Sequence, residues 1–366
     1  PLKYLVPFVI IGVGLYALAA GFLSAENVVF DERTFLRLIL MISFLATIIE
    51  GLRRHLHFGY HLSSLVLTFI LCLVGTKIGA LVVVFAFALT CLSVGRQVLI
   101  MMDLKPEGAL AICFVIGSGV IGTASGLLAM TPFNNVITYS AILLAPILIN
   151  RKWVCLFLTD VFSSTKASNH QPSKNFVQLF VASFFVFYVY VCLLPEVGWD
   201  ALSVHLFIPE YIKFFGSWSF DPNLYVFSLM PNMFVWNISI VNMLGGETAA
   251  RFLNFGCLIA AAALGREFVL WAGGSIKEAD VGTLILFSSP FCFLEISNLF
   301  TDLAWSMYVL AALSILLSSW EKAVFSKNVY LVAILLGFAA ASKAVTLILL
   351  PLFLVISLLR LAKSAS

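Results

Sequence analysis

Residues 109–130, ALAICFVIGSGVIGTASGLLAM, form an apolar run of 22 residues without a charge. A helix needs about 20 such residues to cross a bilayer. The run does not alternate between polar and apolar residues, which favours a helix over a barrel strand. The whole chain has the same character, because 62% of its 366 residues are hydrophobic and 11% are charged. A soluble domain carries about 25% charged residues. In hydrocarbon, only helices and closed barrels satisfy every backbone polar group.

The predicted fold is therefore all-α, a polytopic transmembrane bundle of about 11–13 spans. Twelve candidate spans can be placed, at 5–23, 35–50, 61–76, 79–95, 109–130, 135–150, 175–194, 247–265, 281–298, 303–319, 329–342 and 344–359. Several are shorter than a full crossing, which tilt or local thinning of the bilayer can accommodate.

The distribution of Lys and Arg predicts the orientation of these spans. With the N-terminus in the cytoplasm, 15 of the 21 basic residues fall in cytoplasmic loops, as the positive-inside rule requires. This assignment holds only if the apolar stretch 224–244 does not cross. We therefore expect residues 195–246 to form one extracytoplasmic segment with amphipathic helices on the membrane surface. The predicted location is the bacterial inner membrane or an equivalent one.

A polar stretch at residues 151–174 divides the chain. It contains four basic residues followed by a run rich in Ser, Asn and Gln. We interpret it as a cytoplasmic linker between a six-span block at residues 1–150 and a second block at residues 175–366. No repeat relates the two blocks, which weakens the hypothesis of an inverted-repeat transporter.

One acidic residue stands out just after the seventh predicted span, in the sequence GWDALSVHL at residues 198–206. The predicted topology places Asp200 on the outer face, where the phosphate and sugar of a membrane-bound donor would lie. A carboxylate there can act as a general base on an acceptor hydroxyl. The alternative is that Asp200 caps the helix that follows it.

Four short segments resemble the GT-C superfamily of polytopic membrane glycosyltransferases. They are GWDALSVHL at 198–206, GGETAARFLN at 245–254, FTDLA at 300–304 and GFAAASKAVT at 337–346. Their order and shared outer placement follow the family, and the resemblance covers about residues 175–360. Protein O-mannosyltransferases and the lipid A aminoarabinose transferase belong to this superfamily.

The resemblance implies a GT-C-like module in which Asp200 is the catalytic residue. It implies transfer of a sugar from a polyprenyl-phosphate donor to an acceptor on the extracytoplasmic face, without a nucleotide-sugar site. The chain departs from the family in its six extra spans and its short module, so a non-catalytic subunit of a larger membrane complex is an alternative. Asp200 also lacks the neighbouring Glu of some relatives, so the resemblance does not decide whether a divalent cation takes part.

Two cations are candidates for binding the lipid phosphate, because a charge near hydrocarbon persists only when it is paired. They are Arg251 and Lys343. Arg251 could instead form a local i,i+4 pair with Glu247. Lys343 could instead extend its ammonium group from a helix end toward water.

Four further polar residues are candidates for substrate binding. Asp302 could orient a substrate or cap its helix. Glu295 lies within an apolar run, where an ionisable residue is functional by default, with Lys343 or a bound proton as its counterpart. His205 and Glu210 lie close to Asp200 in sequence, but at 100° per residue these three do not share a helix face. This spacing disfavours a three-ligand metal site.

Other sequence motifs indicate structural roles and not catalytic or binding roles. Residues 117–122 match G-x-G-x-x-G but lie within a predicted span, so the dinucleotide-binding interpretation fails. Gly122 and Gly126 instead indicate sites of close helix packing. Asn237 begins a glycosylation pattern with apolar flanks. No basic cluster suggests nucleic acid as a partner. The predicted partners are membrane lipid, the sugar donor and an acceptor of unknown identity; a lipid or solute transporter is the remaining alternative.

Overall fold

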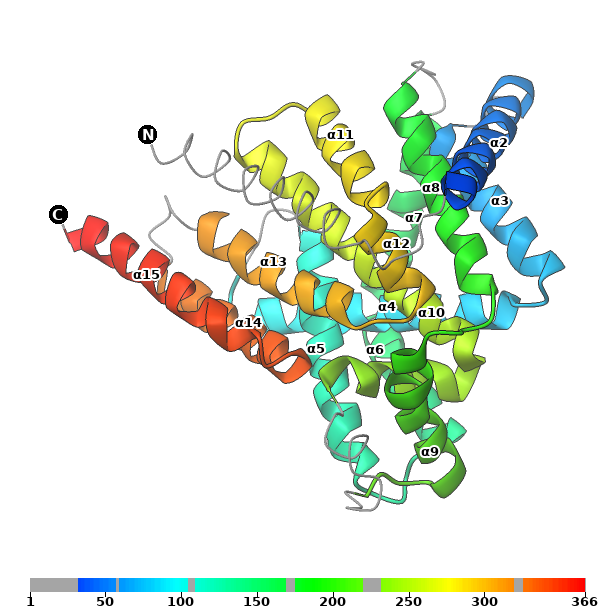
Figure 1. Cartoon of the computed structure of the whole chain (residues 1–366). Helices are drawn as coiled ribbons and strands as arrows, with labels where there is room; N and C mark the ends of the chain where they lie inside the picture. Colours follow the sequence, from blue (N-terminus) through cyan, green and yellow to red (C-terminus); the bar gives the residue numbers. More distant parts are fainter. Residues whose placement is uncertain are drawn as a thin grey trace.

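The computed structural model describes residues 32–56, 59–104, 109–168, 175–219, 232–318 and 325–365, and within these ranges it is helical with no strand. The N-terminal helices are α2 (Glu32–Leu56), α3 (Tyr60–Val74), α4 (Ile78–Met101), α5 (Ala109–Ala129), α6 (Val136–Ile149), α7 (Arg151–Ser168) and α8 (Phe176–Leu193). They are followed by η2 (Ala201–His205), α9 (Phe207–Phe215), α10 (Met233–Trp271), α11 (Ile276–Phe287), α12 (Pro290–Ser297), α13 (Asp302–Ser318), α14 (Phe325–Ser342) and α15 (Thr346–Ala365). Figure 1 shows α13, α14 and α15 along one edge of the bundle and α9 at its lower end.

Within the described ranges, α4, α5, α8 and α10 are each long and apolar enough to cross a membrane. Three bent pairs, α2 with α3, α6 with α7, and α11 with α12, raise the number of candidate spans to seven. Shorter apolar segments of 10–17 residues lie within α13, α14 and α15, at Asp302–Leu317, Lys327–Ser342 and Thr346–Leu358. The prediction of an all-α, multi-pass membrane protein is confirmed. Within these ranges, the number of helices long enough to cross the membrane is smaller than the sequence suggested. The predicted span 5–23 lies outside the described residues.

Two predicted segments differ locally from the structure. The span expected at 281–298 is two helices, α11 and α12, which meet at an angle of 54°. Pro290 is the first residue of α12, and a proline ring cannot continue the hydrogen-bond ladder of the preceding helix. The stretch expected as a linker, 151–174, is helical over Arg151–Ser168.

Helix α10 buries most of residues 233–245 among other helices, which the sequence did not predict. We expected these residues to lie on the membrane surface, but Val235, Ile238 and Val241 are fully buried and the segment packs on α5 and α9. Its apolar residues face all sides, so it needs protein around it. Gly246 separates this part from the rest of α10, because its φ of 71° and ψ of −172° are not helical. A residue with a side chain rarely adopts a positive φ.

Glycines allow the first helices to cross closely. A Cβ on Gly117 of α5 would overlap the backbone of Cys91 on α4, and one on Gly95 of α4 would overlap the backbone of Cys113 on α5. This reciprocal arrangement brings the two helix backbones into contact, as small residues do in membrane bundles.

Helix α10 packs against α5 at two further glycines. A Cβ on Gly122 would lie 2.8 Å from the Met233 sulfur, and one on Gly126 would lie 2.8 Å from the Trp236 ring. The predicted packing role of Gly122 and Gly126 is therefore confirmed. Asn237 is fully buried in this contact, so its glycosylation pattern is inaccessible in the folded chain. Residues from both sides of the predicted linker share one hydrophobic core, and the division into two blocks stays a prediction.

Candidate functional site

Several helix ends converge on the segment that follows α8. The guanidinium of Arg251, in α10, donates to the carbonyl oxygen of Val191 near the end of α8 at 3.0 Å and to that of Ser297 at the end of α12 at 3.2 Å. Trp305, near the start of α13, donates its indole N–H to the hydroxyl of Thr346 at the start of α15. These contacts join the ends of α8 and α12 through Arg251, and the starts of α13 and α15 through Trp305.

The predicted catalytic residue lies in this segment with its side chain exposed. Asp200 directly precedes the π-helical turn η2, and its carboxylate makes no capping hydrogen bond. The alternative in which Asp200 caps its helix is therefore not supported. The wide turn is closed by the bond from the Leu206 N–H to the Ala201 carbonyl at 2.8 Å. Single π turns are rare and frequently occur at functional sites.

His205 is the neutral centre of a cluster of charged groups. Burial lowers the pKa of its imidazole to about 4, which the carboxylates of Asp200 and Asp302 oppose and the ammonium of Lys343 reinforces. Its Nδ1 is buried and has no hydrogen-bond partner. Three other predicted site residues, Asp200, Asp302 and Lys343, thus interact electrostatically with His205, although they are separated by up to 143 positions in the sequence.

Lys343 and Asp302 form the charged pair of this cluster. The Lys343 Nζ lies 2.5 Å from Oδ1 of Asp302, and each side chain keeps more than a third of its surface exposed. The Glu295 carboxylate accepts from the backbone N–H of Asp302 at 3.2 Å. Glu295 thus interacts with the start of α13, and it also interacts electrostatically with Lys343, one of the two counterparts that we expected.

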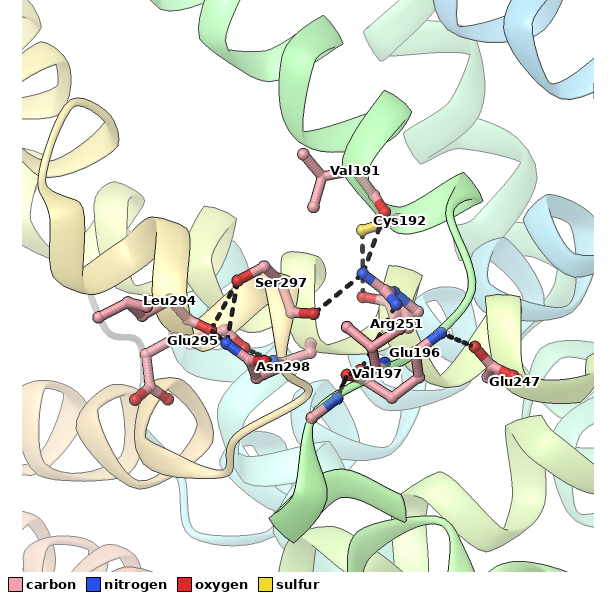
Figure 2. Close-up of polar contacts among 12 residues, drawn as sticks. Val191, Cys192, Glu196, Val197, Glu247, Arg251, Leu294, Glu295, Ser297 and Asn298 are labelled. Atoms are coloured by element: carbon pink, nitrogen blue, oxygen red, sulfur yellow. Dashed lines mark hydrogen bonds and ion pairs between the residues drawn. The ribbon is translucent and has the colours of Figure 1, made fainter. Parts of the chain in front are cut away.

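Arg251 has a different surrounding from the one we expected (Figure 2). Its side chain is 2% exposed and its Nη1 lies 3.5 Å from the Glu196 carboxylate. Glu247, the expected i,i+4 partner, instead accepts from the backbone N–H of Glu196 at 2.5 Å. The guanidinium is enclosed by protein groups, so Arg251 stabilises the junction of α8, α10 and α12.

Glu196 is the residue that sequence reasoning missed. Its Oε1 accepts from the backbone N–H groups of Val197 at 3.0 Å and Gly198 at 2.8 Å, which fixes the turn that leads to Asp200. Burial raises the pKa of Glu196, and these two N–H groups and Arg251 oppose the shift. The available signal was a carboxylate two residues beyond the end of the span predicted at 175–194, because a buried carboxylate must find a partner.

Glu210 lies outside this cluster of contacts. Its Oε1 accepts from the Asn242 amide at 2.7 Å and from the Lys213 ammonium at 3.4 Å, which joins α9 to α10. In the part of the chain that the structure describes, no group of three or more His, Cys, Asp or Glu side chains is placed to hold a metal ion. A divalent cation therefore stays a prediction without a structural site.

The fold and site define an α-helical, multi-pass membrane protein with a charged cluster where its helix ends meet. Comparison with protein-family models, curated proteins and solved structures finds no match.

Proposed function

We propose that this chain is an integral membrane glycosyltransferase that uses a polyprenyl-phosphate sugar donor. The observation that supports it most is the exposed, uncapped carboxylate of Asp200, which interacts electrostatically with a neutral His205, as the Lys343–Asp302 pair also does. The resemblance of four sequence segments to GT-C enzymes supports the same function. In this proposal the site opens to the extracytoplasmic face.

The reaction assigns one role to each group. Asp200 removes the proton of the acceptor hydroxyl as its oxygen attacks the anomeric carbon. The bond between that carbon and the phosphate oxygen breaks, and polyprenyl phosphate leaves with the electron pair. The configuration at carbon inverts in a single displacement.

The other groups bind the charged parts of the substrates. Lys343 faces the donor phosphate, where a fixed positive charge stabilises the negative charge that develops on the leaving group. Asp302 orients the Lys343 ammonium group before the donor binds. His205 is neutral, so it places no positive charge beside the Asp200 carboxylate that would weaken it as a base.

The test is a transfer assay on the full chain in liposomes with a panel of polyprenyl-phosphate sugars. Asp200→Asn is expected to lower the release of polyprenyl phosphate by about 100- to 10,000-fold, the usual contribution of a general base. Asp160→Asn, a change at an exposed carboxylate on α7, is the matched control and should keep full activity. Full activity of Asp200→Asn, or no release by the wild-type chain with any donor, would contradict the proposal.

A further inference from the structure

Large apolar side chains flank Asp200 on the surface. Val197 is 77% exposed, Trp199 is 74% exposed and Leu202 is 49% exposed. They lie in the connection between α8 and α9, outside every candidate span. Burial of these side chains away from water would stabilise the protein by roughly 25 cal/mol for every Å² of apolar surface removed from water.

This apolar segment is anchored at the boundary of the bundle. Its first part is held by Glu196, whose backbone N–H donates to Glu247 in α10. Trp199 follows the end of α8 at Leu193 by six residues, so it lies within roughly 20 Å of that end even if the chain is fully extended. Val197 and Trp199 therefore lie no farther than this from the end of the α8 span.

Helix α15 also exposes apolar side chains. Lys343 directly follows α14 and interacts electrostatically with His205. Helix α15 begins three residues after Lys343. The start of α15 exposes Leu347 and Ile348, on an apolar helix that contacts the rest of the described bundle mainly through α14. The segment that carries Asp200 and the exposed start of α15 are thus linked through the electrostatic interaction of His205 with Lys343.

The geometry points to direct contact between Val197, Trp199 and Leu202 and the lipid bilayer at its interface. Tryptophan suits this position because its ring is apolar and its indole N–H can bond to water or headgroups. The contact would hold Asp200 at the depth of the lipid headgroups. It does not require Asp200 to be catalytic, so it stands or falls separately from the proposed glycosyl transfer.

Spin labels at single cysteines test this contact. Six of the seven native cysteines are buried, and Cys155 is exposed, so Cys155→Ser provides a background with little labelling. Val197→Cys, Trp199→Cys and Leu202→Cys would each be labelled in the full chain, reconstituted in phosphatidylcholine liposomes. Power saturation then compares collisions with oxygen, which concentrates in lipid, and with a water-soluble nickel complex.

The expected result is that labels at two or more of these positions collide at least threefold more with oxygen, relative to nickel, than a label at Lys277→Cys. Lys277 is an exposed residue in the first turn of α11. Ile348→Cys, on the exposed side of α15, sets the value for a lipid-facing label. Nickel collisions equal to those at Lys277 would overturn the proposal by placing the segment in water. Immobile labels shielded from both reagents would also overturn it, by showing that protein covers the segment.

Discussion

The guanidinium of Arg251 and the carboxylate of Glu196 lie 3.5 Å apart, both buried, at the junction of α8 with α10. The pair joins helices from parts of the chain 55 residues apart. Glu196 also bonds the backbone of the two residues that follow it. The position of Asp200 therefore depends on two charges that no substrate needs to contact.

Replacing Arg251 with Met should destabilise the chain. The change leaves the Glu196 carboxylate buried without its counter-charge, and breaking a buried pair costs about 3–5 kcal/mol. The free energy of unfolding in detergent measures this loss. The double variant Arg251→Met with Glu196→Gln should recover much of the stability, because neither charge remains. A single variant within about 0.5 kcal/mol of wild type would show that the pair does not act as the structure indicates.

Stability should also depend on His205 between pH 6.5 and about 4. The pKa of His205 is lowered to about 4 in the folded chain, so within this window the unfolded chain binds more protons. Stability contributed by neutral His205 is fully present above pH 6.5 and is lost as the pH falls toward 4, by up to about 3 kcal/mol.

Unfolding measured across this pH range should show a shallower dependence for His205→Gln than for wild type. His61→Gln, at an exposed position on α3, should leave the dependence unchanged. Equal pH dependence in wild type and His205→Gln would mean that the imidazole is not held neutral by burial.

A single methyl group at Gly117 should weaken the crossing of α4 and α5. The added carbon would overlap the Cys91 backbone, and overpacking of this kind costs about 1–3 kcal/mol. Gly265→Ala in α10 is the control, because a Cβ there meets nothing within 4 Å; it should be neutral or slightly stabilising. Thermal unfolding in detergent compares the two, and equal melting temperatures would argue against the close crossing.

Replacing Lys343 should lower the rate of sugar transfer and leave the stability of the chain almost unchanged. Its pair with Asp302 is partly exposed, and such pairs contribute at most about 1 kcal/mol. Lys343→Met should therefore unfold almost like wild type but lose about 100-fold in sugar transfer, the effect of removing one stabilising group from a transition state. Lys327→Met, which breaks the partly exposed pair with Asp103, should retain transfer. Comparable activity in both variants would remove Lys343 from the site.

The sequence predicted the helices because hydrocarbon leaves little choice of backbone structure. Every predicted span in the described ranges coincides with one helix or with a bent pair of helices. It also predicted the packing role of Gly122 and Gly126, since small residues within membrane spans commonly let two helix backbones approach closely. Pro290 marks the break within the span predicted at 281–298, but a proline alone does not distinguish one kinked helix from two helices.

Long-range pairing could not be predicted in the same way. From sequence alone, Glu247 is the nearest partner for Arg251, one helical turn away. The structure prefers Glu196, because the end of α8 packs on α10 and both charges are enclosed there. Similarly, the polar residues between 232 and 242 suggested a surface segment, whereas Asn237 donates to the Ser118 carbonyl inside the bundle.

The side of the membrane on which Asp200 lies tests the central claim most directly. In the Cys155→Ser background, Asp200→Cys can be treated with a membrane-impermeant maleimide in sealed vesicles of known orientation. The proposal predicts labelling from the extracytoplasmic side alone. Labelling from the cytoplasmic side alone would contradict it, because a donor presented at the outer face could then not reach this residue.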